Sequence, residues 1–169
     1  MNKFIRIIFL NILVIPIFFL NLATASEKLK IGLLVPMSGS NKDLGQSIIK
    51  AVRLAIKDID NDLIEVIPKD TASTPNKTLQ SALELKDLGV KIVIGPIFHK
   101  NLVYLEEAID LTFLSLTNKT LELPKNVISA GINSTSQLNT IKKFIKENNI
   151  KKTIFLSPIQ DYEFEIKKG

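Results

Sequence analysis

The hydrophobic positions of the chain fall into short apolar runs that alternate with stretches of helical periodicity. Residues 29–35 form a nearly unbroken apolar run, which is typical of a strand buried on both faces of a parallel sheet. After a turn-rich loop, Ile48, Val52 and Ile59 recur at the spacing of one helix face and predict a helix over about 44–60. The same order of strand, loop and helix repeats along the chain. The pattern therefore predicts an α/β fold with an open, doubly wound parallel sheet.

The later elements are predicted from the same periodicity together with turn and cap signals. Strands are expected over 63–67, 90–94, 113–116, 127–130 and 153–156, and helices over about 75–88 and 102–109. Thr74 is placed to cap the helix that starts at Pro75, and Gly89 is placed to end it. The connections between strands are short, which favours right-handed βαβ units.

A final helix is predicted to begin at residues 134–137, whose sequence Ser-Thr-Ser-Gln is a capping box. Leu138, Ile141, Phe144 and Ile145 follow at helical spacing. Because an apolar stripe on a helix is usually buried, we expect these four side chains to face inward.

The first 25 residues have the three parts of a secretory signal peptide. Lys3 and Arg6 precede an apolar run over 7–20, and Ala23 and Ala25 place small residues at the two positions that a signal peptidase recognises. The apolar run is shorter than the roughly 20 residues that a membrane-spanning helix needs, so an uncleaved anchor is the weaker interpretation. We predict export, to the periplasm if the source is a double-membraned bacterium.

The composition narrows the chemistry that the exported chain can carry. The sequence has no cysteine, so a disulfide, a thiolate nucleophile and a cysteine-ligated metal are all excluded. Without Lys3 and Arg6 of the signal peptide, the formal net charge falls from +5 to about +3, which does not suggest a nucleic-acid partner. The sequence contains no recognisable nucleophile motif that its single histidine, His99, could activate, so a catalytic triad is not expected. The glycines match no phosphate-binding motif, which disfavours nucleotide binding. We expect a protein that is not an enzyme and needs no cofactor or metal; an enzyme on a flavodoxin-like fold is the least favoured alternative.

Polar residues gather in the loops that follow the predicted strands. Since the carboxyl ends of parallel strands share one edge of a sheet, these loops predict a site for a small polar or anionic solute. The alternative for single residues is structural: a hydroxyl that caps a turn, a phenyl ring that packs under its loop, a solvated lysine. The candidate ligand-binding residues are Ser38, Gly39, Phe98, His99, Lys100, Ser115, Thr117 and Asn118. Asp70 and Thr71 follow another predicted strand at the same edge of the sheet, and we call the loops at this edge the rim.

Two stretches of sequence carry a family resemblance. Residues 30–39 are Lys-Ile-Gly-Leu-Leu-Val-Pro-Met-Ser-Gly and are followed by Gly45-Gln46, and residues 89–96 are Gly-Val-Lys-Ile-Val-Ile-Gly-Pro. Asp70-Thr71 lies between them. In this order and spacing, over about 28–162, the chain resembles the type 1 periplasmic-binding-protein family, which includes the branched-chain amino-acid-binding proteins of ABC importers.

In that family, a solute is held between two α/β lobes and the loaded protein docks on a membrane permease. The resemblance therefore implies two partners, a small polar solute and an ABC permease. It also implies ligand contacts from His99 and Lys100 after the third strand and from Ser115 and Thr117 after the fourth. Amino-acid binders of the family have small hydroxyl residues after the third strand, and the His-Lys pair departs from that pattern.

A second resemblance is to the penicillin-binding-protein activators, which share the fold. Gly95-Pro96 after the third strand, Asn118 after the fourth, and Gly131 with Gln137 fit that group. The alternative it implies is an envelope interaction protein without a transport role, whose partner is a cell-wall synthase.

The resemblance also implies a domain organisation. Residues 1–25 are expected to be a signal peptide, 26–132 an N-terminal ligand-binding lobe, and 133–169 the start of a second lobe that is incomplete in this chain. A truncated or split gene product would explain that. Because one of the two lobes that hold the solute is incomplete, we expect weak or undetectable solute binding by the chain alone. We also expect the strand over 153–156 to be free to pair with another chain.

Overall fold

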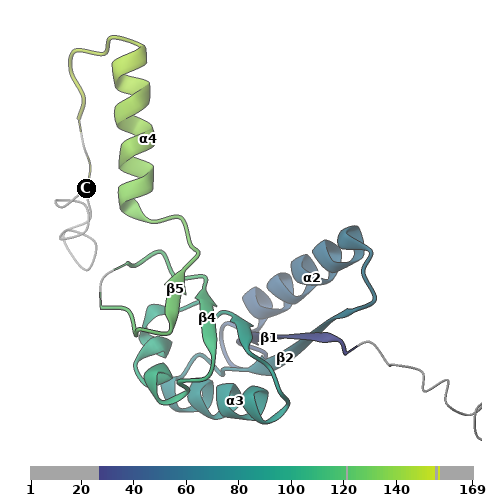
Figure 1. Cartoon of the computed structure of the whole chain (residues 1–169). Coiled ribbons are helices and arrows are strands. Elements are labelled where there is room, and N and C mark those ends of the chain that lie inside the picture. The colour runs from purple at the N-terminus through teal and green to yellow at the C-terminus, as the bar shows by residue number, and fades with distance from the viewer. Residues whose placement is uncertain (1–26, 121, 155, 157–169) are drawn as a thin grey trace, which may run out of the picture.

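A five-stranded parallel sheet organises the described part of the chain. The structure is a computed structural model that describes residues 27–120, 122–154 and 156. All pairings between neighbouring strands are parallel, in the order β2-β1-β3-β4-β5 (Figure 1). The predicted α/β class with a parallel sheet is therefore confirmed. The predicted signal peptide lies outside the described residues.

The strands and the two long helices before β3 lie close to their predicted positions. Pro75 is the first residue of its helix, and Thr74 precedes it in an extended conformation without a side-chain cap hydrogen bond. The elements are β1 (Leu29–Val35), α2 (Lys42–Ile59), β2 (Ile64–Asp70), α3 (Pro75–Asp87), β3 (Ile92–Ile94), the 3-10 turns η1 (His99–Leu102) and η2 (Leu105–Glu107), β4 (Thr112–Ser115), β5 (Val127–Ser129) and α4 (Ser134–Glu147).

The two faces of the sheet are covered unequally. On one face, Leu34, Val93 and Phe113 are fully buried in the main core, beneath α3 and the 3-10 turns. On the other face, α2 covers β1 with a smaller cluster that includes Leu33 and Ile49. Side chains alternate between faces along a strand, so the neighbours of the main-core residues on β3, β4 and β5 point to this second face.

The prediction of a helix over 102–109 is wrong. The structure has two short 3-10 turns there, η1 and η2. The physical reason is the spacing of the apolar residues: Leu102, Leu105, Ala108 and Leu111 are all buried and lie three residues apart. A 3-10 helix has three residues per turn and so places such residues on one face, whereas an α-helix would rotate them away from the core.

The predictions for the C-terminal part are also corrected. No residue of α4 is buried: of the four side chains expected to face inward, Leu138 and Ile145 are only half-buried, and Ile141 and Phe144 are 42% and 58% exposed. Asn133, not the predicted capping box, caps this helix by accepting a hydrogen bond from the backbone N–H of Ser136 at 2.8 Å. The strand expected over 153–156 is not formed at residues 153, 154 and 156, because no described strand lies beside it to supply hydrogen bonds.

Strand β2 forms one edge of the sheet. It pairs only with β1, and its register places Pro68 opposite Leu33. Proline has no backbone N–H and is therefore found in edge strands rather than central ones. Among the helices of the described residues, none has the length and apolar character needed to cross a lipid bilayer.

Candidate functional site

The connections after β1 and β3 leave the sheet toward opposite faces. Helix α2 follows β1 and packs on the face of Leu33 and Ile49, whereas the turns after β3 pack on the other face through Leu102 and Leu105. Neighbouring parallel strands that lead to opposite faces leave a crevice between their carboxyl ends, and open α/β sheets bind ligands there. The candidate site is therefore the pair of loops after β1 and β3, with the ends of β2 and β4 on either side.

Asp70, the last residue of β2, organises the loop after β1. Its Oδ1 accepts hydrogen bonds from the backbone N–H groups of Met37 and Ala72 at 2.7 and 2.8 Å. Its Oδ2 accepts one from the Ser38 hydroxyl at 2.6 Å. Thr71 continues the link by donating its N–H to the carbonyl of Val35 at 3.0 Å. The sequence placed Ser38 and Asp70 on one rim, and the structure brings them into direct contact.

These hydrogen bonds set the charge state of Asp70. Partial burial alone raises the pKa of a carboxyl group because it disfavours the charged form. The hydrogen bonds from the Ser38 hydroxyl and from the backbone N–H groups of Ala72 and Met37 outweigh that effect and lower the pKa of Asp70 below its ordinary value. The rim thus carries a fixed negative charge beside Ser38 at neutral pH.

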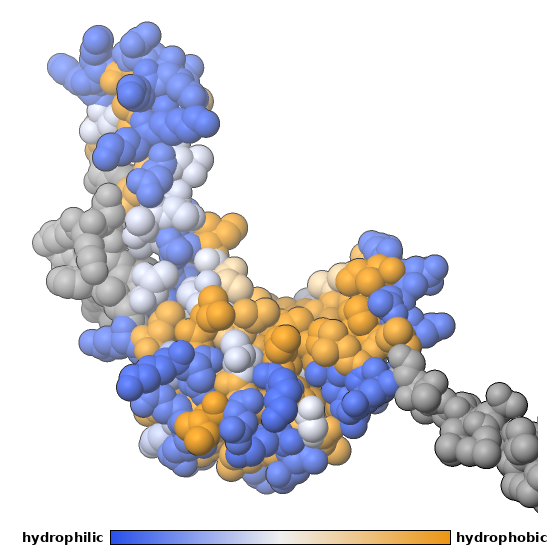
Figure 2. Space-filling model, in the orientation of Figure 1, coloured by the Kyte–Doolittle hydropathy of each residue, from blue (hydrophilic) through white to orange (hydrophobic). Residues whose placement is uncertain are grey.

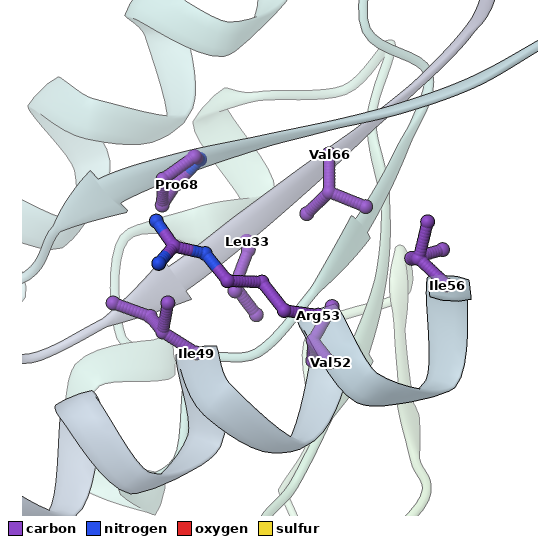
Figure 3. Close-up of a pocket in the computed structure, with 7 residues that line it drawn as sticks. All are labelled: Leu33, Ile49, Val52, Arg53, Ile56, Val66 and Pro68. Carbon is purple, nitrogen blue, oxygen red and sulfur yellow. The ribbon is translucent and has the colours of Figure 1, made fainter. Parts of the chain in front are cut away.

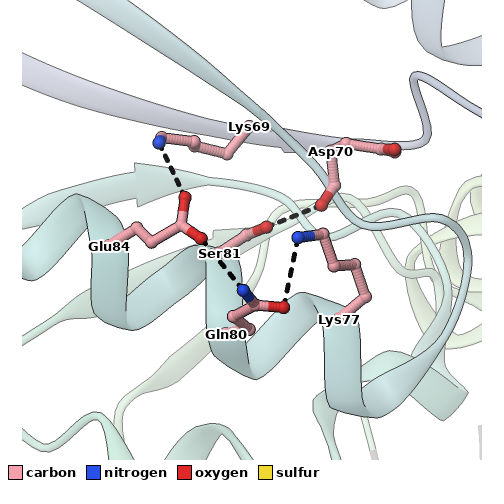
Figure 4. A network of polar contacts seen from close by, with 6 residues as sticks. All are labelled: Lys69, Asp70, Lys77, Gln80, Ser81 and Glu84. Atoms are coloured by element: carbon pink, nitrogen blue, oxygen red, sulfur yellow. Dashed lines mark hydrogen bonds and ion pairs between the residues drawn. The ribbon is translucent and has the colours of Figure 1, made fainter.

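A network of polar contacts fastens the end of β2 to α3 (Figure 4). The Ser81 hydroxyl donates to the backbone carbonyl of Asp70 at 2.6 Å. Lys69 forms an ion pair with Glu84 at 2.7 Å, and Gln80 donates to the same carboxylate at 3.3 Å. The hydrogen bond from Lys69 lowers the pKa of Glu84. Because α3 holds the backbone of Asp70 in place, the carboxylate of Asp70 is presented to the loop after β1.

The loop after β3 approaches β1 closely and carries the aromatic and cationic candidates. A Cβ atom added at Gly95 would meet the backbone carbonyl of Leu34, so only glycine allows this approach. Phe98 and His99 are half-buried and Lys100 is exposed. The Lys100 ammonium lies 5.9 Å from the centre of the Phe98 ring, a cation–π contact. This loop carries an aromatic ring and a positive charge at the carboxyl end of β3.

The hydroxyl-bearing residues at the end of β4 and just after it are buried. Ser115 is fully buried and donates to the carbonyl of Pro96 at 2.8 Å, which ties the ends of β3 and β4 together. Thr117 is also buried; its hydroxyl accepts from the N–H of Lys119 at 3.2 Å, and its carbonyl accepts from the Ser129 hydroxyl at 2.8 Å. Ser129 was not singled out in the sequence because a lone serine in a strand carries no signal.

The structure thus divides the eight candidates by exposure. The exposed members are Ser38, Gly39, Lys100 and Asn118, the half-buried ones are Phe98 and His99, and the buried ones are Ser115 and Thr117. They come together along the carboxyl ends of three neighbouring strands, β1, β3 and β4. In the part of the chain that is described, no cluster of three or more metal-ligating side chains occurs.

A cavity of about 230 Å³ lies apart from this rim, between α2 and strands β1 and β2 (Figure 3). Apolar side chains such as Ile49, Val52 and Val66 line it, and the Arg53 side chain extends along it. It has too few polar groups to orient a polar solute. The polar rim therefore remains the better candidate for the predicted ligand.

Comparisons with known proteins agree with this geometry. The family model described as periplasmic binding protein matches residues 28–166. A comparison with curated proteins gives no match. Among solved structures, full-length LpoA from Haemophilus influenzae is similar with a TM-score of 0.66 and 20% identity, over 85% of this chain and 27% of that one.

Two solved transport proteins are similar over a shorter stretch. A solute-binding protein of an ABC transporter from Rhodopseudomonas palustris, in complex with 3,4-dihydroxybenzoic acid, has a TM-score of 0.58 and 25% identity, over 73% of this chain and 37% of that one. The branched-chain amino-acid transporter substrate-binding protein LivJ from Streptococcus pneumoniae, in complex with isoleucine, has a TM-score of 0.55 and 21% identity, over 72% and 38%. The chain spans less than two fifths of the length of each of these three structures.

Proposed function

This chain belongs to the periplasmic binding protein family, and from that premise we propose that it supplies the first lobe of an extracytoplasmic solute-binding protein of the ABC-importer type. The observation that carries this proposal is the crevice between the carboxyl ends of β1 and β3, where connections to opposite faces diverge. Ligands of open α/β sheets bind at such a point. The partners proposed are a small polar solute and a membrane permease.

The exposed and half-buried rim residues suggest the chemistry of the solute. Lys100 offers a positive charge, Phe98 an aromatic face, and Gly39 a backbone without a side chain beside it. We propose that a small carboxylate with an apolar or aromatic body binds there, with its anionic end toward Lys100. The isoleucine and the dihydroxybenzoic acid bound to the two transport proteins are solutes of that kind.

The buried hydroxyls have a supporting role in this proposal. Ser115 joins the ends of β3 and β4 through its hydroxyl, and Thr117 joins the loop after β4 to β5 through its carbonyl, so we expect both to position the rim rather than contact solute. Asp70 does the same for the loop after β1. A single lobe leaves the solute open to water on one side, and water weakens polar contacts, so binding to this chain is expected to be weak until a second lobe closes over it.

Nuclear magnetic resonance of the labelled chain tests the proposal, because it detects weak binding residue by residue. Isoleucine, 4-hydroxybenzoate and 3,4-dihydroxybenzoate are added up to millimolar concentration. We expect at least one of them to shift the amide signals of Ser38, Gly39 and residues 98–100, and Lys100→Gln to remove the shifts. Lys50→Gln on the exposed side of α2 is the matched control. Shifts confined to other residues, or none with any solute, would contradict the proposed site.

A second function, that of an envelope interaction protein without transport, is favoured by one observation. Ser115 donates its hydroxyl hydrogen to the carbonyl of Pro96, which leaves one donor fewer for a solute than the sequence suggested. The partner would then be a cell-wall synthase; the similar structure LpoA from Haemophilus influenzae is described as a regulator of PBP1A. Retention of the chain by an immobilised cell-wall synthase of the source organism, with no solute response in the resonance experiment, would support this alternative.

A further inference from the structure

The cavity between α2 and strands β1 and β2 has one charged residue and otherwise apolar walls. Side chains such as Leu33, Val52 and Val66 form these walls, and Arg53 is the charged residue among those that line the cavity. Figure 2 shows apolar side chains on α2 and on the sheet beside it, with hydrophilic ones on the outer side of the helix. The volume of about 230 Å³ is below the roughly 300–1,000 Å³ of sites for drug-sized ligands, so the cavity suits a small, largely apolar molecule.

The two ends of the cavity differ in character. In Figure 3, the guanidinium group of Arg53 lies toward Pro68 and Ile49, whereas Val66 and Ile56 lie toward the opposite end. The order of these residues along the chain explains the arrangement, because α2 passes from Ile49 to Ile56 while β2 returns from Val66 to Pro68. A molecule that lies along the cavity therefore meets a positive charge at one end and apolar side chains at the other.

The guanidinium group of Arg53 is available to a ligand. The side chain is exposed and forms no ion pair with another described residue. Asp70 follows Pro68 on the same face of β2, but its carboxylate accepts hydrogen bonds from other groups and forms no ion pair with Arg53. A guanidinium group presents its N–H donors as a planar fork that fits the two oxygens of a carboxylate. A ligand carboxylate is therefore a suitable partner for Arg53.

The charge of the cavity favours a carboxylate over a phosphate. One guanidinium group balances the single negative charge of a carboxylate, whereas a phosphate monoester carries about −1.5 to −2 at neutral pH. The walls supply no further cation, since the other lining residues of the described chain are apolar. Placing unbalanced charge against apolar walls costs free energy, so the cavity selects a monoanion.

The length of the cavity sets the length of the apolar part of the ligand. The helix residues that line it, Ile49 to Ile56, span about 10 Å at roughly 1.5 Å per residue. An extended peptide advances about 3.6 Å over the three bonds of each residue, so an extended chain advances about 1.2 Å per bond. A chain of about eight carbons therefore matches the distance from one end of the cavity to the other.

We propose that this cavity binds a medium-chain alkyl carboxylate of about eight carbons. Its carboxylate contacts the guanidinium group of Arg53, and its tail lies between α2 and β2 and reaches toward Ile56 and Val66. The cavity lies apart from the rim, so this second site does not depend on the solute proposed for the loops after β1 and β3.

Nuclear magnetic resonance of the methyl-labelled chain with octanoate tests the site. We expect saturable shifts of the methyl signals of Ile49, Val52, Ile56 and Val66, with a dissociation constant of about 0.1–1 mM. The terminal methyl group of octanoate should show nuclear Overhauser effects to Ile56 and Val66. Each buried methylene contributes a factor of about four in affinity, so butanoate should bind at least about tenfold more weakly even in a cavity open to water on one side.

Variants of Arg53 separate a contact with the carboxylate from simple coverage of apolar surface by its side chain. Arg53→Met keeps an apolar side chain but removes the charge, and should weaken octanoate about fivefold while changing the affinity for neutral octan-1-ol less than twofold. Arg53→Lys should restore most of the octanoate affinity. Lys57→Met is the matched control, because Lys57 lies one turn further along α2, is exposed and does not line the cavity. It should change octanoate binding less than twofold. Circular dichroism checks that each variant is folded.

Three results would overturn the proposal. The first is the absence of saturable shifts of the cavity methyl signals at millimolar octanoate. The second is an octanoate affinity that Arg53→Met leaves unchanged or that Lys57→Met lowers equally, since the Arg53 side chain would then only cover apolar surface or act at long range. The third is a response confined to the amide signals of Ser38, Gly39 and residues 98–100, which would place the carboxylate at the rim and support the proposed function alone. Cavity shifts without rim shifts would support the second site and leave the rim without a solute.

Discussion

The substitution Asp70→Asn should destabilise the chain in a manner that depends on pH. Three hydrogen bonds end on this carboxylate, from the Met37 and Ala72 N–H groups and from the Ser38 hydroxyl. An asparagine keeps one acceptor oxygen for the two N–H groups but loses the charge and the acceptor for Ser38. Hydrogen bonds to charged groups contribute about 1.5–3 kcal/mol each. Asp70 is partly exposed and water screens it, so we expect a total loss of about 1–2 kcal/mol at neutral pH.

The sign of the pH dependence follows from the pKa of Asp70, which lies below its ordinary value in the folded chain. A carboxyl group with a lowered folded-state pKa adds stability that is fully present above its unfolded-state pKa of about 3.9. That stability is lost as the pH falls through the folded-state pKa. Wild type should therefore exceed Asp70→Asn in stability at neutral pH, and the gap should shrink below about pH 4.

Urea unfolding followed by far-ultraviolet circular dichroism measures both quantities. The matched control is Asp62→Asn, in the exposed turn before β2, which should change the free energy of unfolding by less than about 0.5 kcal/mol. Two results would refute the reasoning. One is an Asp70→Asn variant as stable as wild type at neutral pH, and the other is a stability gap that persists unchanged in acid.

Three further predictions concern packing and capping. Gly45→Ala should destabilise the fold by about 3 kcal/mol or more because the added Cβ meets a backbone carbonyl of the β1–α2 loop, whereas Gly39→Ala, in open space at positive φ, should cost about 1 kcal/mol in urea unfolding. Leu85→Ala in the main core should cost about 2–5 kcal/mol, and Leu54→Ala on the surface of α2 less than about 0.5 kcal/mol, by the same assay. Asn133→Ala should reduce the helical circular dichroism of α4 while leaving the urea midpoint of the lobe unchanged; a shifted midpoint would show that α4 is packed on it.

The fold was predictable from sequence wherever a pattern has one physical solution. A seven-residue apolar run such as 29–35, bounded by turn signals, favours a central parallel strand buried on both faces, and β1 occupies that place. The spacing of residues 102–111 was ambiguous, because a period of three fits a 3-10 turn and approximates an α-helix over one or two turns. For α4, the apolar stripe correctly predicted a helix but carried no information on whether a partner for the stripe is present.

The candidate site was predictable as a location and not as a set of contacts. Parallel strands bring their carboxyl ends to one edge, so Ser38, Asp70 and the loop after β3 had to be neighbours. The direction of the Ser115 hydroxyl depends on which carbonyl of an adjacent loop lies within reach, and no local sequence signal encodes that. The ordering role of Asp70 likewise comes from two N–H groups that only the fold brings to it.

The proline in the edge strand has a consequence for the growth of the sheet. An edge strand grows into an intermolecular sheet when an incoming chain finds free N–H and C=O groups in sequence along it, which is the first step toward fibrils. Pro68 lies within β2 and removes one donor from that row. The opposite edge, β5, is only three residues long. Both edges of the sheet therefore disfavour the addition of strands from further copies of the chain. This protects against aggregation a chain whose helix α4 exposes apolar side chains.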